Sequence, residues 1–260
     1  MQLAASIGLC GRWLIDATLN ADAAPSSHAV RTHYGKYTPR FDADFAVLST
    51  GVVADEKDPG FVSPQPGTAF ANSTRHPAPL QDVHDACDAL PDSDTVYDEV
   101  FLDLTIRAPT NAKGAVFDWM FLSAEYPEHV GSQFNDSFLA LVDGRAFQGN
   151  AAFDGGAHRV TVNSVHFDAC DSAEVCPMVK NACARLPDEL DGTGYELHDG
   201  DGARVGAGTG WLGSQFAVAR GDVVKLRLAI FDGGDHLVDS AVVLDGFGWT
   251  LVPSSGLTSP

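Results

Sequence analysis

The stretch Y-D-E-V-F-L-D-L-T-I-R, residues 97–107, alternates apolar and polar side chains over most of its length. Its apolar positions fall on one face, at Val100, Leu102, Leu104 and Ile106. A period of two is the pattern of a β-strand with one buried face. The pattern returns in V-V-K-L-R-L-A-I-F at 223–231, and strand-like runs also occupy 115–122, 138–147 and 239–252. We therefore expect an all-β protein.

Turn residues separate these runs. The chain contains 26 glycines and 14 prolines, which suits a sandwich with many connections. We expect an antiparallel β-sandwich of jelly-roll type with long loops at 54–78 and 184–210. One or two short helices are expected, one near 80–90 and another within the first thirty residues. The sequence indicates one domain, residues 1–252, followed by a tail or linker at 253–260.

The charge of the chain limits its partners. Thirty-five acidic residues against sixteen basic ones give a formal net charge of −19. Such a chain repels phosphate backbones, so we expect no nucleic-acid partner. No apolar run approaches the ~20 residues that cross a bilayer, so no transmembrane segment is expected. Acidity alone can serve solubility, but it also favours hard cations.

The five cysteines are Cys10, Cys87, Cys170, Cys176 and Cys183. The last three are too widely spaced for paired zinc ligands and suit short disulfide loops. We expect an oxidising compartment, with Cys10 bonded to Cys87 and one bond among the last three. The alternative is five reduced, buried cysteines in the cytosol. Residues 1–10 make a poor signal peptide, so a signal is expected to be absent from the sequence shown.

Two acidic clusters each follow a strand-like run. S-A-E-Y-P-E-H-V-G-S-Q-F-N-D spans 123–136, and F-D-G-G-D-H-L-V-D-S spans 231–240. Carboxylates that meet in space raise one another's pKa or collect a cation, and irregular loops suit the loose geometry of Ca²⁺. Each cluster can equally be a solvated turn. Spacing alone leaves both alternatives open.

The evidence for catalysis is weak. Paired carboxylates are the machinery of glycosidases, and this chain has many carboxylates. There is neither a G-x-S-x-G motif nor a cysteine–histidine signature. The alternative enzyme would be a secreted carbohydrate-active hydrolase with Glu125 as acid and Asp136 or Asp235 as its partner. Among the aromatic residues, Tyr126 and Trp211 are the candidate ligand contacts, whereas Trp119 and Trp249 are expected in the core.

Three stretches resemble the choice-of-anchor L domain, a module of secreted and cell-surface bacterial proteins. They are F-A-V-L-S-T-G at 45–51, F-L-S-A-E-Y-P-E-H-V-G-S-Q-F-N-D-S-F at 121–138 and L-A-I-F-D-G-G-D-H-L-V-D-S-A-V-V-L-D at 228–245. The resemblance implies export, a β-sandwich and no established catalytic activity. It also implies that the two acidic clusters form one site, with Glu125, Asn135, Asp136, Asp232, Asp235 and Asp239 as metal ligands. One departure is Ala124, where the family commonly has a glutamate.

These observations predict an extracellular, calcium-stabilised module. It would serve adhesion or would bind a glycan or protein partner at the cell surface. A structural subunit of a self-associating surface assembly is a further alternative. We also expect Cys170 to bond with Cys176 or Cys183 beside the site.

Overall fold

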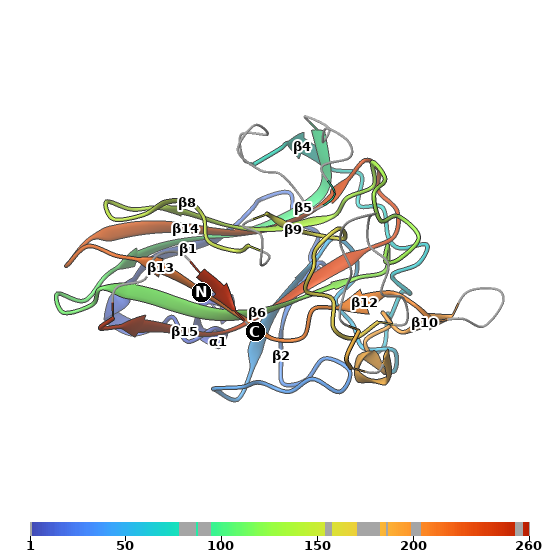
Figure 1. The fold of residues 1–260 in the computed structure, drawn as a ribbon, viewed down its shortest axis with the longest axis horizontal. Coiled ribbons are helices and arrows are strands. Elements are labelled where there is room, and N and C mark those ends of the chain that lie inside the picture. The colour runs from blue at the N-terminus through green and yellow to red at the C-terminus, as the bar shows by residue number, and fades with distance from the viewer. Residues whose placement is uncertain are drawn as a thin grey trace.

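The computed structural model describes residues 2–77, 87, 95–153, 158–170, 183–185, 187–198, 204–252 and 257–259. Within these residues the chain forms two antiparallel sheets that lie face to face and do not close into a barrel (Figure 1). The expected all-β sandwich is confirmed. The predicted helix near 80–90 falls outside the described residues except for Cys87, whereas the short helix expected near the N-terminus is present as α1, Gln2–Ser6.

The first sheet is built around β5, the strand that contains the alternating stretch 97–107. Its main path runs β1-β5-β14-β7-β8, with β4 beside β5 and β9 beside β7. The bounds are β1 Leu14–Leu19, β4 Ser73–Arg75, β5 Thr95–Arg107, β7 Ser137–Asp143, β8 Gln148–Asn150, β9 Val160–Thr161 and β14 Val223–Gly233.

The second sheet faces the first across the core. Its main path runs β16-β13-β6-β15-β3-β2, with β12 beside β6. The bounds are β2 His28–Arg31, β3 Phe45–Ser49, β6 Gly114–Ser123, β12 Ala207–Gly208, β13 Leu212–Ala217, β15 Ser240–Thr250 and β16 Leu257–Ser259. Strand β16 lies in the segment expected to be a tail.

Few described elements lie outside the two sheets. They are the helix α1, the hairpin of β10, Leu197–His198, with β11, Arg204–Val205, and two 3-10 helices, η1, Gly11–Trp13, and η3, Pro187–Leu190. The stretch 184–210, expected to be a loop, therefore contains η3, β10, β11 and β12. No helix among the described residues is long and apolar enough to cross a membrane.

The core forms where the alternating faces meet. Val100, Leu102, Leu104 and Ile106 of β5 are buried, and the matching residues of β14 are buried with them. Trp119 of β6 is fully buried, with its ring 5.3 Å from that of Phe138 on β7 and its Nε1 donating to Ser214 Oγ at 2.8 Å. Each hydrophobic run therefore contributes its apolar face to the layer between the sheets.

Two connections cross between the sheets at the same end of the sandwich. One joins β6 to β7 through residues 124–136, and the other joins β14 to β15 through 234–239. Ser123 pairs with Ser240 in the second sheet, and Ser137 pairs with Phe231 in the first. Because strands at both ends of the crossovers are paired, the two acidic stretches of the sequence lie side by side.

One disulfide joins Cys170 to Cys183, one of the two pairings expected. Cys176 lies outside the described residues. The expected Cys10–Cys87 bond is wrong, because Cys10 is an exposed free thiol whereas Cys87 is disulfide-bonded. Phe247 N donates to Ile7 O at 2.7 Å, which holds the N-terminal segment against β15 and leaves the Cys10 thiol in solvent.

The packing of Trp119 predicts its contribution to stability. Trp119→Ala removes a fully buried ring and should lower the free energy of unfolding by about 3–5 kcal/mol. Leu251→Ala is the control, because Leu251 is 63% exposed and should change stability by less than ~0.5 kcal/mol. Urea denaturation followed by tryptophan fluorescence and circular dichroism measures both, and equal losses would contradict this description of the core.

Candidate metal centre at the end of the sandwich

The core-facing rows of four strands run into polar side chains at the end where the crossovers lie. On β14 the buried row continues through Ile230 to Asp232. On β7 the buried row includes Phe138 and begins at Asp136, one residue before the strand itself. On β6 the row ends at Ser123 and Glu125, and on β15 it begins at Ser240. The strand period therefore points these side chains into the protein rather than into solvent.

Asp136 is at the centre of this group and is fully buried. Its Oδ2 accepts a hydrogen bond from Ser240 Oγ at 2.7 Å, and its Oδ1 accepts one from Gly233 N at 3.2 Å. Ser123 Oγ lies 3.0 Å from Ser240 Oγ. Burial raises the pKa of Asp136 to about 8.

Glu125 lies beside Asp136 on the same crossover. It is 2% exposed, and its Oε2 accepts a hydrogen bond from Asp136 N at 3.2 Å. Burial and the adjacent Asp136 carboxylate raise the pKa of Glu125 well above its usual range. A single backbone hydrogen bond is a small compensation for a carboxylate removed from water.

Asp232 has the least compensation. It is 1% exposed, and neither carboxylate oxygen accepts a hydrogen bond that meets ordinary distance and angle limits. Burial raises the pKa of Asp232 well above its usual range, and the Asp136 carboxylate adds to that effect. A buried carboxylate with two unbonded oxygens requires a cation, a proton or water.

Asp239 reaches the site from the second crossover and is held in a narrow space between two glycines. A Cβ placed on Gly51 would lie 1.7 Å from Asp239 Oδ2, and one on Gly67 would lie 2.5 Å from Oδ1. Thr68 N donates to Oδ1 at 3.0 Å. Burial raises the pKa of Asp239 to about 7. Both glycines therefore provide space that the carboxylate occupies.

This group has no basic partner in the part of the chain that the structure describes. Among the described residues, no ion pair joins Glu125, Asp136, Asp232 or Asp239 to a lysine, arginine or histidine. The group is therefore strongly anionic when ionised. As the side chains stand, no set of three or more described His, Cys, Asp or Glu residues forms a ready metal-binding group.

The other residues predicted for the site differ in position. Asn135 is buried, with its N donating to Gly233 O at 3.1 Å and its Oδ1 accepting from Asn163 Nδ2 at 3.3 Å. Asp235 is only partly buried and caps Leu237 N at 2.8 Å. Its charge contributes to the raised pKa of Glu125.

The two aromatic candidates also differ. Tyr126 is fully buried with its ring 4.8 Å from that of Phe167, so it presents no face to a ligand. Trp211 is partly exposed; its ring makes an edge contact with Phe45 at 6.3 Å, and the Arg40 guanidinium lies 5.8 Å from its centroid.

Some residues of the site were not singled out from the sequence. Ser123, Ser240 and Thr50 form its hydroxyl layer, with Ser240 N donating to Thr50 Oγ1 at 2.9 Å. Gly51 provides the close approach for Asp239. The available signal for Thr50 and Gly51 was the end of F-A-V-L-S-T-G, where a threonine and a glycine directly follow a wholly buried strand that ends in a serine.

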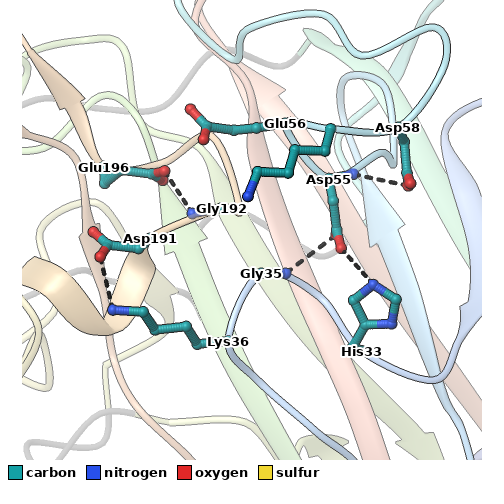
Figure 2. A pocket seen from close by; sticks show the side chains of 10 residues that line it. His33, Gly35, Lys36, Asp55, Glu56, Asp58, Asp191, Gly192 and Glu196 are labelled. Carbon is teal, nitrogen blue, oxygen red and sulfur yellow. Dashed lines mark hydrogen bonds and ion pairs between the residues drawn. The ribbon is translucent and has the colours of Figure 1, made fainter.

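A surface pocket of about 700 Å³ is lined by three segments of the chain, at 33–36, 55–58 and 191–196 (Figure 2). Lys36 pairs with Asp191 at 2.7 Å, and His33 pairs with Asp55 at 3.0 Å. Glu196 accepts hydrogen bonds from the backbone of Gly192 and Gly194, at 2.6 and 2.9 Å. The pKa of the neighbouring Glu56 is raised, first by burial and then by Glu196.

Two buried tyrosines connect the pocket to the metal centre. The pKa of the Tyr34 hydroxyl is raised by burial and then by Asp55 of the pocket, with a further contribution from Asp239 of the centre. Tyr195 is likewise buried, and the charge of Asp239 adds to the rise in its pKa caused by burial. The pocket and the carboxylates are therefore electrostatic neighbours.

The raised pKa values predict how metal-free protein responds to pH. Between about pH 4 and pH 8 the folded state holds protons on Asp136 and Asp239 that the unfolded chain has released, so stability falls as pH rises. Each pKa unit corresponds to about 1.4 kcal/mol. Urea denaturation of metal-stripped protein should show a loss above ~1 kcal/mol from pH 5.5 to 8.5. Asp136→Asn should flatten the slope, and a stability that rises over this range would contradict the assignment.

The glycine contact gives a second prediction. Gly51→Ala should strongly destabilise the fold or displace Asp239, because the new Cβ would overlap Oδ2. Gly248→Ala is the matched control, since its nearest contact would be an ordinary 3.5 Å from Val116 Cγ2. Thermal unfolding measures the difference. A Gly51→Ala protein as stable as the control would show that Asp239 lies elsewhere.

Comparison with known proteins agrees with this architecture. No curated protein and no solved structure gives a significant match. The family model for the choice-of-anchor L domain matches residues 17–249, nearly the whole chain, and its span includes both crossovers and the strands that flank them. The Cys170–Cys183 bond suits an exported protein. The chain belongs to the choice-of-anchor L domain family and is therefore a module of the secreted or cell-surface type.

Proposed function

We propose that this protein is a surface recognition module whose two crossovers are ordered by Ca²⁺. The observation that carries the proposal is Asp232, which is 1% exposed and has no hydrogen bond of ordinary geometry to either carboxylate oxygen. Glu125, Asp136 and Asp239 surround it with further negative charge. A divalent cation would replace mutual repulsion with attraction to all four groups.

The donor set favours calcium. Around Asp232 the available donors are carboxylate oxygens, the hydroxyls of Ser123 and Ser240, and the backbone and amide oxygens of Asn135. All are hard oxygen ligands, and Ca²⁺ accepts six to eight of them in a loose geometry. Zinc would favour nitrogen or sulphur ligands. The carboxylates have to turn toward a common point when the ion binds, because the described side chains do not yet form a metal-binding group.

Ion binding would order the two crossovers as well as compensate the charge of the carboxylates. The ligands come from both crossovers, so an ion between them ties the β6–β7 connection to the β14–β15 connection. A ligand that binds only the folded state stabilises it by mass action. The loops on which Asp239 packs, at Gly51 and Gly67, would be held at the same time.

The pocket of Figure 2 is the surface we assign to recognition. Its lining contains ammonium, imidazole and carboxylate groups. These groups can donate hydrogen bonds to the hydroxyls of a glycan and accept hydrogen bonds from them. One wall of the pocket is formed by Asp55, Glu56 and Asp58, which follow Gly51 by four to seven residues. Because Gly51 packs on Asp239, ordering of Asp239 would also fix this wall. We therefore expect glycan binding to depend on calcium.

The calcium requirement is tested by thermal unfolding of metal-stripped protein at pH 8. Millimolar Ca²⁺ should raise the melting temperature by several degrees, which corresponds to about 1–3 kcal/mol at [Ca²⁺] well above the dissociation constant. Equimolar Mg²⁺ should give a much smaller shift, because its octahedral geometry is stricter. No shift with Ca²⁺, at any concentration up to 10 mM, would sink the proposal.

Asp232→Asn separates the roles of charge and packing. Without metal the variant should melt at a higher temperature than the natural protein, because an uncompensated buried charge is gone. With Ca²⁺ its gain in melting temperature should be largely lost. Asp16→Asn removes an exposed carboxylate instead and should leave both values unchanged. An Asp232→Asn protein that still gains fully from Ca²⁺ would contradict the ligand assignment.

The recognition surface is tested on a glycan array with and without calcium. Binding should require Ca²⁺ and should fall at least tenfold in Glu56→Gln combined with Lys36→Ala, which removes two charged groups from two different segments of the pocket. The control Asp143→Asn lies on β7, outside the pocket, and should bind normally. Binding that survives the double substitution would place recognition on another face.

A further inference from the structure

Outside the proposed centre, the buried carboxylate of Asp98 lies in a bulge of β5. Ile230 of β14 pairs with Val100, whereas Asp232 pairs with Tyr97, so Asp98 and Glu99 together oppose one residue of β14. Asp98 has a φ of 46°, a conformation that a non-glycine residue seldom adopts. The bulge turns the Asp98 side chain inward, where it is 0% exposed.

The Asp98 carboxylate is only half satisfied. Its Oδ2 accepts hydrogen bonds from Phe70 N and from His236 Nδ1, both at 3.1 Å. The His236 ring packs against Tyr97 at a tilt of 56°, with centroids 4.4 Å apart. Oδ1 is buried and accepts no hydrogen bond of ordinary geometry. Burial raises the pKa of Asp98, and contacts that include the Asn72 backbone N–H only partly offset that rise. An unbonded oxygen on a fully buried carboxylate has the same need for a cation that Asp232 has.

The segment over Asp98 brings two further oxygens with no partner. Thr68 Oγ1 and Asn72 Oδ1 are both buried and unbonded. The backbone of this segment is tied to the carboxylates on either side, since Thr68 N donates to Asp239 Oδ1 at 3.0 Å and Phe70 N donates to Asp98 Oδ2 at 3.1 Å. The three unsatisfied oxygens therefore belong to Asp98 and to the short segment 68–72 that is bonded to it through Phe70.

Asp239 stands between this group and the proposed centre. Burial raises the pKa values of Asp136 and Asp232, and the charge of Asp239 adds to both rises. Burial also raises the pKa of Asp239, and the charge of Asp98 adds to that rise. The buried row thus contains five carboxylates, Glu125, Asp136, Asp232, Asp239 and Asp98. One divalent ion at Asp232 would compensate only two of these charges. At the other end, Asp98 has His236 as a partner at Oδ2 and no partner of ordinary geometry at Oδ1.

We propose that Asp98 binds a second hard divalent cation, with oxygens of Thr68 and Asn72 as further ligands and Asp239 shared between the two ions. The proposal rests on the calcium function proposed above. Its ligand class is the same, because every unsatisfied donor in the group is an oxygen. His236 Nδ1 carries its proton toward Asp98 and so orients the carboxylate from outside the coordination shell.

The second ion would have a task distinct from that of the first. The first joins the two crossovers, whereas the second joins residues 68–72 to β5 and to Asp239. Binding there would close the segment that carries Gly67 over the carboxylates. Hydrogen exchange in residues 67–72 should therefore slow on calcium loading.

The experiment is a count of bound calcium. Metal-stripped protein is loaded with Ca²⁺, passed over a desalting column and examined by native mass spectrometry, with calorimetric titration for affinities. We expect two ions in the natural chain, one in Asp98→Asn, and two in the control Glu99→Gln, whose buried carboxylate bonds Thr74 Oγ1 at 2.8 Å instead of residues 68–72. Circular dichroism establishes that each variant is folded.

A second variant protects the test against misfolding at the bulge. Asn72→Ala leaves Asp98 in place and should weaken the second ion at least tenfold while the first ion keeps its affinity. One ion in the natural chain, unaffected by Asp98→Asn and Asn72→Ala, would overturn this inference and leave the calcium function standing. No bound ion in the natural chain would overturn both.

Discussion

The cost of burying carboxylates at one end of the core is the constraint on which the rest of this structure depends. Asp136, Asp232 and Glu125 occupy positions that the strand period reserves for apolar side chains, and Asp239 is buried in the crossover beside them. No described lysine, arginine or histidine pairs with these four residues. An apolar residue at each place would stabilise a plain sandwich better. Four acids buried there need a cation, a proton or water to offset the cost of their burial.

The topology explains why the acids meet at this end. Strands β6 and β15 are neighbours in one sheet, and β7 and β14 are neighbours in the other. Each crossover therefore begins beside the point where the other one ends. An irregular connection between sheets exposes backbone groups that no ladder satisfies, and the site supplies partners for several of them, such as Gly233 N to Asp136 and Thr68 N to Asp239. The carboxylates thus satisfy loop backbone even without a metal ion.

The sequence predicts the sandwich and the meeting of the two acidic stretches, and it could have predicted more. Counting by twos from Leu226 through Ile230 places Asp232 inside, and counting back from Phe138 does the same for Asp136. Counting back from Val100 also places Asp98 inside, but it does not reveal the bulge that sets Asp98 and Glu99 opposite one residue of β14. The Cys10–Cys87 pairing failed because spacing along the chain carries no information on which cysteines meet across two sheets.

The glycines connect the buried charge to the surface. Gly51 and Gly67 fit closely around Asp239. The carboxylate therefore cannot move without a change in the path of the two loops that contain these glycines. Residues 55–58, which form a wall of the pocket, follow the first of these glycines directly. A change in the charge state at Asp239 must therefore alter either its packing or the loops that enclose it. A module built in this way would present an ordered pocket where calcium is abundant, outside the cell, and a looser one wherever the carboxylates face one another without an ion.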